Sequence, residues 1–284
     1  MRRPQPLDEN SSRESQGFAR TFQQRPPRLR GHLAWLLICC LLSLAACQSQ
    51  SDAWTRIQRS GVLRVGIDPT YPPFAVATDN DLWGFDVDLM RAIAAAYDLE
   101  AQFIYFGYDG LYDALSTEQV DVLASALVVQ PERTRDFAYS QPYFDAGQVL
   151  IVPAASPIAA PDDLAEHVLA VELGAQGHVL ATTWQRRLPN LTIVPYRNVG
   201  EALDAAANGN ADAALVDNIS GRLYLQQTPH LVRLSPPVES EPYALVVRAD
   251  DALLLTRLNA ALQDLQRSGA LDEIIRRWLD SPAN

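Results

Sequence analysis

The sequence predicts an α/β fold built from two lobes. Short apolar runs alternate with segments of helical spacing from residue 62 onward, which is typical of a doubly wound parallel sheet. A connector rich in Pro, Ala and Ser at 153–161 interrupts this alternation, and a second alternating series follows it. The chain is expected to cross between the lobes near 146–149 and again near 239–243. Two crossing segments form a hinge and leave a cleft between the lobes.

The first lobe is expected to begin with a helix that Gly61 ends and to continue with alternating strands and helices. The expected order is helix 53–60, strand 62–67, helix 86–97, strand 101–106, helix 111–115 and strand 120–127. Three prolines within residues 69–73 exclude regular structure there, so 68–74 should be a rigid loop at the end of the first strand.

The second lobe shows the same alternation and is followed by a strand that returns to the first lobe. The expected elements are strand 147–152, a helical turn at 162–166, strand 168–172, a helix opening at 174–178, strand 191–195, helix 199–208, strand 213–216, helix 219–226, the returning strand 243–247, and terminal helices 252–268 and 271–279.

The N-terminal region predicts export. Residues 33–46 form an apolar run of 14 residues, which is short for a membrane span but suits the core of a signal peptide. The run ends in Leu44-Ala-Ala-Cys47, which resembles a bacterial lipobox. That resemblance implies a signal peptide over 1–46, cleavage before Cys47 and lipidation of Cys47. The alternative is a plain secretory signal with an incidental cysteine.

Composition restricts the possible chemistry. The chain has 284 residues and a net charge of −11, and all 23 basic residues are Arg, which excludes Schiff-base lysines and P-loop lysines. Without residues 1–46 it keeps 16 Arg against 31 acidic residues, a net charge of −15. This acidity argues against nucleic acid and anionic lipid headgroups as partners. Only Cys47 would remain, so neither a disulfide nor a thiolate metal site is expected.

Five segments of the chain form a distinctive set in their order and spacing. They are Leu63-Arg-Val-Gly-Ile-Asp-Pro-Thr-Tyr-Pro-Pro-Phe74, Gly84-Phe-Asp-Val-Asp-Leu89, Tyr108-Asp-Gly-Leu111, Pro131-Glu-Arg133 and Tyr143-Phe-Asp-Ala-Gly-Gln148. Taken together, they resemble the family-3 periplasmic solute-binding proteins, which are the amino-acid receptors of ABC importers. The resemblance extends from about residue 61 to 279. It implies a type II periplasmic-binding-protein fold, with 47–146 and 241–284 in lobe 1 and 147–240 in lobe 2.

The resemblance also implies a function. The protein would be a monomeric extracytoplasmic lipoprotein that captures an amino acid and delivers it to an ABC permease, with no cofactor, no metal and no catalytic residues. The alternative is an enzyme on the same scaffold, similar to the cyclohexadienyl or arogenate dehydratases. In that case Glu172 or Asp217 would serve as a general acid with a raised pKa.

Two residues suit the ends of a zwitterion. Arg133 follows the apolar run 120–127 and Pro131, which places it beyond the carboxyl end of a strand, where open α/β sheets bind ligands. Its planar guanidinium fits a carboxylate in bidentate fashion. Asp217, after strand 213–216, matches the family's ligand for the α-ammonium, although an Asp there is also a common turn former.

Other ligand-binding candidates come from the same resemblance. Tyr71 and Tyr108 match aromatic positions that sandwich the ligand's side chain; alternatively, both are packing residues of the lobe surface. Gln176 lies at a helix start and matches a position whose main-chain N–H meets the carboxylate.

The two acidic candidates bear on specificity. Asp68 and Glu172 match positions near the ligand's side-chain end. Two carboxylates there would repel an acidic ligand and favour a polar or cationic one such as Arg, Lys, ornithine or His. Glu172 could instead form a salt bridge across the cleft.

The loop before Pro131 departs from the family pattern. Ala126 and Val128 stand where Gly and then Ser or Thr are usual. The Ala126 carbonyl and the Val128 N–H survive this change, but a hydroxyl is lost, which removes one hydrogen bond of about 0.5–1.5 kcal/mol. Ser125 could supply a hydroxyl nearby.

Overall fold

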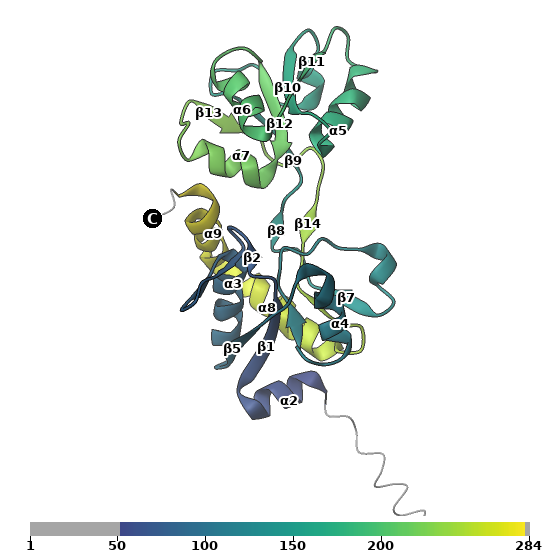
Figure 1. Ribbon diagram of the computed structural model, residues 1–284, viewed down its shortest axis with the longest axis vertical. Helices are drawn as coiled ribbons and strands as arrows, with labels where there is room; N and C mark the ends of the chain where they lie inside the picture. The colour runs from purple at the N-terminus through teal and green to yellow at the C-terminus, as the bar shows by residue number, and fades with distance from the viewer. Residues whose placement is uncertain (1–51, 282–284) are drawn as a thin grey trace, which may run out of the picture. The chain divides into compact units, whose positions relative to one another are not determined.

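The computed structural model describes residues 52–281 (Figure 1). The signal peptide and Cys47 predicted from the sequence lie outside the described residues. Between 52 and 281 the chain forms two five-stranded sheets with helices packed on them, which confirms the predicted α/β class. No helix within this range is long and apolar enough to cross a membrane.

The first sheet has the strand order β5-β1-β6-β15-β7. Its strands are β1 (Val62–Ile67), β5 (Glu100–Tyr105), β6 (Val122–Leu123), β7 (Phe137–Tyr139) and β15 (Val246–Arg248). The accompanying helices are α2 (Ala53–Ser60), α3 (Phe85–Ala95), η1 (Tyr108–Gly110), α4 (Leu111–Ser116), η2 (Pro131–Arg133), α8 (Ala252–Ser268), α9 (Ala270–Ile275) and the π-helical turn η4 (Arg276–Asp280). A small separate sheet joins β2 (Thr70–Tyr71), β3 (Ala75–Ala77) and β4 (Leu82–Trp83).

The second sheet has the strand order β11-β10-β12-β9-β13. Its strands are β9 (Gln148–Pro153), β10 (Val168–Glu172), β11 (Thr192–Tyr196), β12 (Ala213–Asp217) and β13 (Leu231–Arg233). Its helices are η3 (Pro161–Leu164), α5 (Gln176–Gln185), α6 (Val199–Ala207) and α7 (Asn218–Leu225).

Two chain segments connect the sheets. The strands β8 (Phe144–Asp145) and β14 (Pro242–Tyr243) pair antiparallel and run side by side (Figure 1). Just beyond them, Gln148 forms an isolated bridge with Glu239. The lobe boundaries at 146/147 and 240/241 stay predictions.

The structure corrects several element predictions. The proline-rich loop includes the short strand β2, because Thr70 and Tyr71 pair with β3 on the far side of Pro72 and Pro73. Both main sheets are mixed instead of parallel, since β15 runs antiparallel to β6 and β7 and β9 runs antiparallel to β12. The expected strand 243–247 is split into β14 and β15.

The strand expected over 120–127 is reduced to β6. The chain turns at Ala126, where φ is +49°, a left-handed conformation that is incompatible with a continuing strand. Ala124 and Leu127 remain fully buried, so the apolar run reflects burial and not strand length.

The Gly84-Phe-Asp motif fixes the proline-rich loop to helix α3. Gly84 has φ +140°, and a Cβ there would lie 2.2 Å from the Phe74 carbonyl oxygen, so only glycine fits. The next two backbone amides donate hydrogen bonds to this loop: Phe85 N–H donates to Pro73 O and Asp86 N–H donates to Phe74 O, each at 2.9 Å. Phe74 and Phe85 are buried in the core of the first lobe.

Candidate functional site

Six of the predicted ligand-binding residues line one pocket of about 410 Å³ at the edge of the first sheet. These are Asp68, Tyr71, Tyr108, Ser125, Ala126 and Val128, and the same pocket includes Thr70, Glu241 and Tyr243. Loops that follow β1, β5 and β6 supply most of this set, as expected for the carboxyl ends of parallel strands.

The two aromatic candidates present large accessible faces in this pocket. Tyr71 is 45% exposed and Tyr108 is 49% exposed. Tyr71 stacks on the buried ring of Phe74, with centroids 5.5 Å apart and planes 8° from parallel. One face of Tyr71 is therefore supported by the core, which leaves an aromatic surface for a ligand.

The polar groups of the pocket are tied to one another. The Asp68 amide donates to Ser125 Oγ at 3.0 Å, which joins the loops after β1 and β6. The Asp68 carboxylate accepts from the Thr70 amide at 3.1 Å and from the Thr70 hydroxyl at 2.7 Å. Ser125 thus organises the backbone of the site.

The loop 125–128 is held from both sides. On one side the Ala126 amide donates to Asp86 Oδ2 at 2.8 Å. On the other side Leu127 O accepts from the Ala244 amide at 2.9 Å, and Val128 bridges to Tyr243. Ala126 has a left-handed φ of +49°, a conformation that glycine adopts without strain.

The remaining second-lobe candidates line a second pocket of about 220 Å³. Glu172 ends β10, Gln176 begins α5 and Asp217 ends β12, so three adjacent elements deliver them to one edge. The Gln176 amide nitrogen donates to both carboxylate oxygens of Glu239, at 3.2 and 3.1 Å.

Asp217 also has a structural role. Its Oδ1 accepts from the Ser220 amide at 2.8 Å, which caps the N-terminus of α7. Its second oxygen, Oδ2, makes no hydrogen bond within residues 52–281. The helix cap fixes the side chain and so pre-organises that oxygen.

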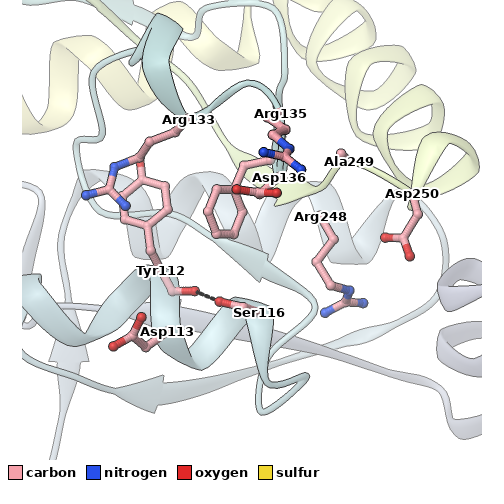
Figure 2. Close-up of a pocket in the computed structure, with 10 residues that line it drawn as sticks. Tyr112, Asp113, Ser116, Arg133, Arg135, Asp136, Arg248, Ala249 and Asp250 are labelled. Atoms are coloured by element: carbon pink, nitrogen blue, oxygen red, sulfur yellow. Dashed lines mark hydrogen bonds between the residues drawn. The ribbon is translucent and has the colours of Figure 1, made fainter.

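Arg133 lies apart from the other candidates. Its guanidinium carbon is 4.2 Å from the centroid of the Tyr112 ring, and its Nε donates to Gln130. It lines a different pocket of about 510 Å³ together with Arg135, Asp136 and Arg248. Figure 2 shows the guanidinium of Arg133 over the Tyr112 ring. The structure therefore does not bring Arg133 and Asp217 into one pocket.

His178 has a local role. Its Nδ1 accepts from the Gly174 amide at 3.1 Å, which closes the turn before α5.

Within residues 52–281, no group of three His, Cys, Asp or Glu residues is arranged to hold a metal ion.

Sequence reasoning missed three residues on the connecting segments. Glu241 and Tyr243 line the first pocket, and Gln148 lines the second. Tyr243 is buried and packs against Phe74, with centroids 5.5 Å apart. The available signal was position: Glu241 and Tyr243 lie within the predicted second crossing of the chain at 239–243, where both lobes are within reach.

The electrostatics of the site are strongly acidic. Burial raises the pKa of Glu241, and the nearby carboxylates of Asp217, Glu239 and Asp145 raise it further. Burial also raises the pKa of Tyr71, and the charges of Asp217 and Glu241 act in the same direction. Both pockets contain two carboxylates, and neither lining within the described residues includes Arg or His.

Comparison with known proteins identifies the family. The model of the bacterial extracellular solute-binding proteins, family 3, matches residues 63–281. The chain is a family 3 solute-binding protein. This solute-binding protein accordingly belongs to a class that acts outside the cytoplasm.

Its relatives include receptors for several amino acids. A probable histidine-binding protein of Neisseria gonorrhoeae is 29% identical over 87% of this chain and 94% of its own length. The ABC transporter arginine-binding protein 1 of Escherichia coli is 26% identical over 76% of this chain and 90% of its own. These relatives are named as binding proteins and not as enzymes.

Solved structures confirm the two-lobed type II architecture. An ancestral cationic amino acid solute-binding protein is 31% identical, with a TM-score of 0.60, over 79% of this chain and 98% of its own. The L-cystine solute receptor of Neisseria gonorrhoeae, in its unliganded open conformation, is 25% identical, with a TM-score of 0.71, over 80% of this chain and 96% of its own.

Proposed function

We propose that this solute-binding protein captures a cationic or polar amino acid, such as Arg, Lys, ornithine or His, and delivers it to an ABC permease. The observation that carries the proposal is the lining of the two pockets. Asp68 and Glu241 line one, Glu172 and Asp217 line the other, and neither lining, as far as residues 52–281 form it, includes a cationic side chain.

The four carboxylates discriminate by charge. An acidic ligand side chain would face uncompensated repulsion, whereas a cation would relieve the repulsion that already raises the pKa of Glu241. Tyr71 and Tyr108 add aromatic faces, and a cation over such a face gains about 0.5–2 kcal/mol. The names of the arginine- and histidine-binding relatives support the same ligand class.

The ligand's α-carboxylate needs a cation that the two pockets lack. Arg133 is the candidate, because it follows the ligand loop directly and its side chain is exposed. In this proposal, rotation about its side-chain torsions moves Arg133 off the Tyr112 ring, and its guanidinium then binds the α-carboxylate of the ligand. The cation–π contact it gives up is worth about 0.5–1 kcal/mol at an exposed site, which a bidentate carboxylate contact readily exceeds.

Anchoring and assembly complete the proposal. Lipidation of Cys47 after cleavage at residue 46 would tether a monomer to the membrane, with the short polar segment 48–52 as a spacer. Closure of the lobes on the ligand would present a surface to the permease, because a ligand favours the state for which it has higher affinity.

A thermal-shift panel tests the proposal. The twenty amino acids, ornithine, citrulline, prephenate and arogenate are screened against the purified protein. Ligand at a hundred times its Kd should stabilise the fold by about 2.7 kcal/mol and raise Tm by several degrees. A shift with basic amino acids that is lost in both Arg133→Ala and Asp217→Ala is the expected result.

Two other outcomes redirect the assignment. A shift with glutamate or aspartate alone would keep the receptor function and refute the charge argument. A response confined to prephenate or arogenate, with loss of the compound over time, would move the protein to the dehydratase alternative.

A further inference from the structure

Asp86 is a charged residue that the proposed binding mechanism does not use. It lies in the first turn of α3 and is fully buried. Within residues 52–281 no Arg or His lies within salt-bridge distance of its carboxyl. A buried carboxyl without a cationic partner is costly, so its hydrogen bonds must account for its presence.

The one hydrogen bond to this carboxyl comes from the ligand loop. Asp86 Oδ2 accepts the Ala126 amide at 2.8 Å, while Oδ1 has no partner within the described residues. Ala126 is the residue of that loop with a left-handed φ of +49°, a conformation that costs an alanine free energy. The bond therefore acts at the position of the loop that most needs support.

We propose that Asp86 is a positioning residue of the ligand site: its buried carboxyl holds the Ala126 amide and keeps residues 125–128 in the conformation that presents Ala126 and Val128 to the pocket. This inference rests on the proposed binding function. It assigns to the Gly84-Phe-Asp motif a role in the site and not only in the core.

The surroundings of Asp86 make this support sensitive to pH. Two ionisable groups face it, Tyr143 from the segment before β8 and Tyr71 from β2. The buried Tyr143 hydroxyl lies beside the carboxyl without a hydrogen bond of ordinary geometry. Burial raises the pKa of Asp86 to about 7, and the neighbouring Tyr143 hydroxyl and the Ala126 amide oppose this only in part.

A cation bound in the pocket favours the charged form of Asp86. Affinity for a cationic ligand should then rise with pH until Asp86 is ionised, and binding should release a proton below that point. Asparagine at position 86 keeps an acceptor oxygen for the Ala126 amide but carries no charge. The variant therefore distinguishes the hydrogen bond that holds the loop from the ionisation of the Asp86 carboxyl.

The experiment uses four variants and two measurements. Asp86→Asn, Asp86→Ala and the double variant Asp86→Ala/Ala126→Gly are compared with Asp88→Asn, which removes a charge from the same helix without touching the loop. Calorimetry gives the Kd for L-arginine at pH 5.5 and 7.5. NMR follows the Ala126 amide shift between pH 5 and 9 in the ligand-free protein.

The expected pattern is specific. Wild type and Asp88→Asn bind L-arginine at least threefold more tightly at pH 7.5, and their Ala126 amide titrates near pH 7. Asp86→Asn stays within about threefold of the wild-type Kd at pH 5.5 but loses the pH step and the amide titration. Asp86→Ala loses at least tenfold, and glycine at 126 restores most of it, because glycine adopts φ +49° without strain.

Contrary results are equally defined. An unchanged Kd in Asp86→Ala, or a loss that Ala126→Gly does not restore, would show that Asp86 serves the core alone. If Asp86→Ala does not fold, the Asp86→Asn comparison decides. If wild type does not bind L-arginine, the ligand class under "Proposed function" fails, while an Ala126 amide that does not titrate overturns the role of Asp86 independently.

Discussion

Replacing Asp86 by Asn should change how the stability of the protein depends on pH. The carboxyl has a pKa of about 7 in the fold against 3.8 for the free side chain. Between these values the folded protein holds a proton that the unfolded chain has released. Stability that is fully present below pH 4 is therefore lost as pH rises toward 7, and it is constant above 7.

The magnitude follows from the two pKa values. Each pH unit costs about 1.4 kcal/mol, so the total loss is about 4 kcal/mol across the window. Urea denaturation of wild type and Asp86→Asn at pH 5, 6, 7 and 8 measures the difference in the free energy of unfolding. The difference should move in favour of the variant by about 3 kcal/mol between pH 5 and 8.

Asp88→Asn serves as the control, since Asp88 pairs with Arg277 at 2.7 Å near the surface and should leave the wild-type slope unchanged. Parallel stability curves for wild type and Asp86→Asn would refute the reasoning, because they would mean that the buried carboxyl has an ordinary pKa in the fold.

Three further predictions concern the site and its support. Ala126→Gly should raise the free energy of unfolding by about 0.5–1 kcal/mol in urea titrations, since relief of the left-handed strain exceeds the entropy cost of glycine; a lower stability would contradict the assigned conformation. Glu241→Gln should weaken binding of L-arginine by about five- to tenfold in calorimetry while leaving L-glutamine binding less affected, and equal losses for both would speak against a charge role. Asp121→Asn should cost about 3–5 kcal/mol of stability without changing Kd, because this buried carboxylate pairs with Arg64 at 2.6 Å and with Arg56 at 2.9 Å. Burial alone would raise the pKa of Asp121, but the two arginines lower it, so the stability that these ion pairs contribute should be lost as pH falls below the ordinary range of an Asp. A stability loss under 1 kcal/mol would show that these ion pairs contribute little to the fold.

Several parts of the fold could be predicted from local pattern. Helix α2 and strand β1 have the predicted bounds, because apolar spacing and Gly61 define them within the chain itself. Helix α8 likewise begins and ends as predicted, with Gly269 in a left-handed conformation after it.

Other parts depend on distant partners. The strands β7, β8 and β13 are two or three residues long and exist through pairing with segments far along the chain. A segment of two or three residues is too short for alternation of apolar and polar residues to indicate a strand. The break of the apolar run at Ala126 has the same origin, since Asp86 and the returning segment hold the turn from outside.

The sequence by itself determined the fold class, the family motifs and which strand ends supply the polar and aromatic groups of the site, because these follow from residue types in a local pattern. Only the tertiary structure decided how those groups combine. It placed Glu241 and Tyr243 beside Asp68 and Tyr71, put Arg133 on Tyr112, and buried Asp86 under the ligand loop. The pairing of β6 with β15 and of β8 with β14 brings these residues together. The burial of their side chains and the interactions of their charges depend on distance in space and not on separation along the chain.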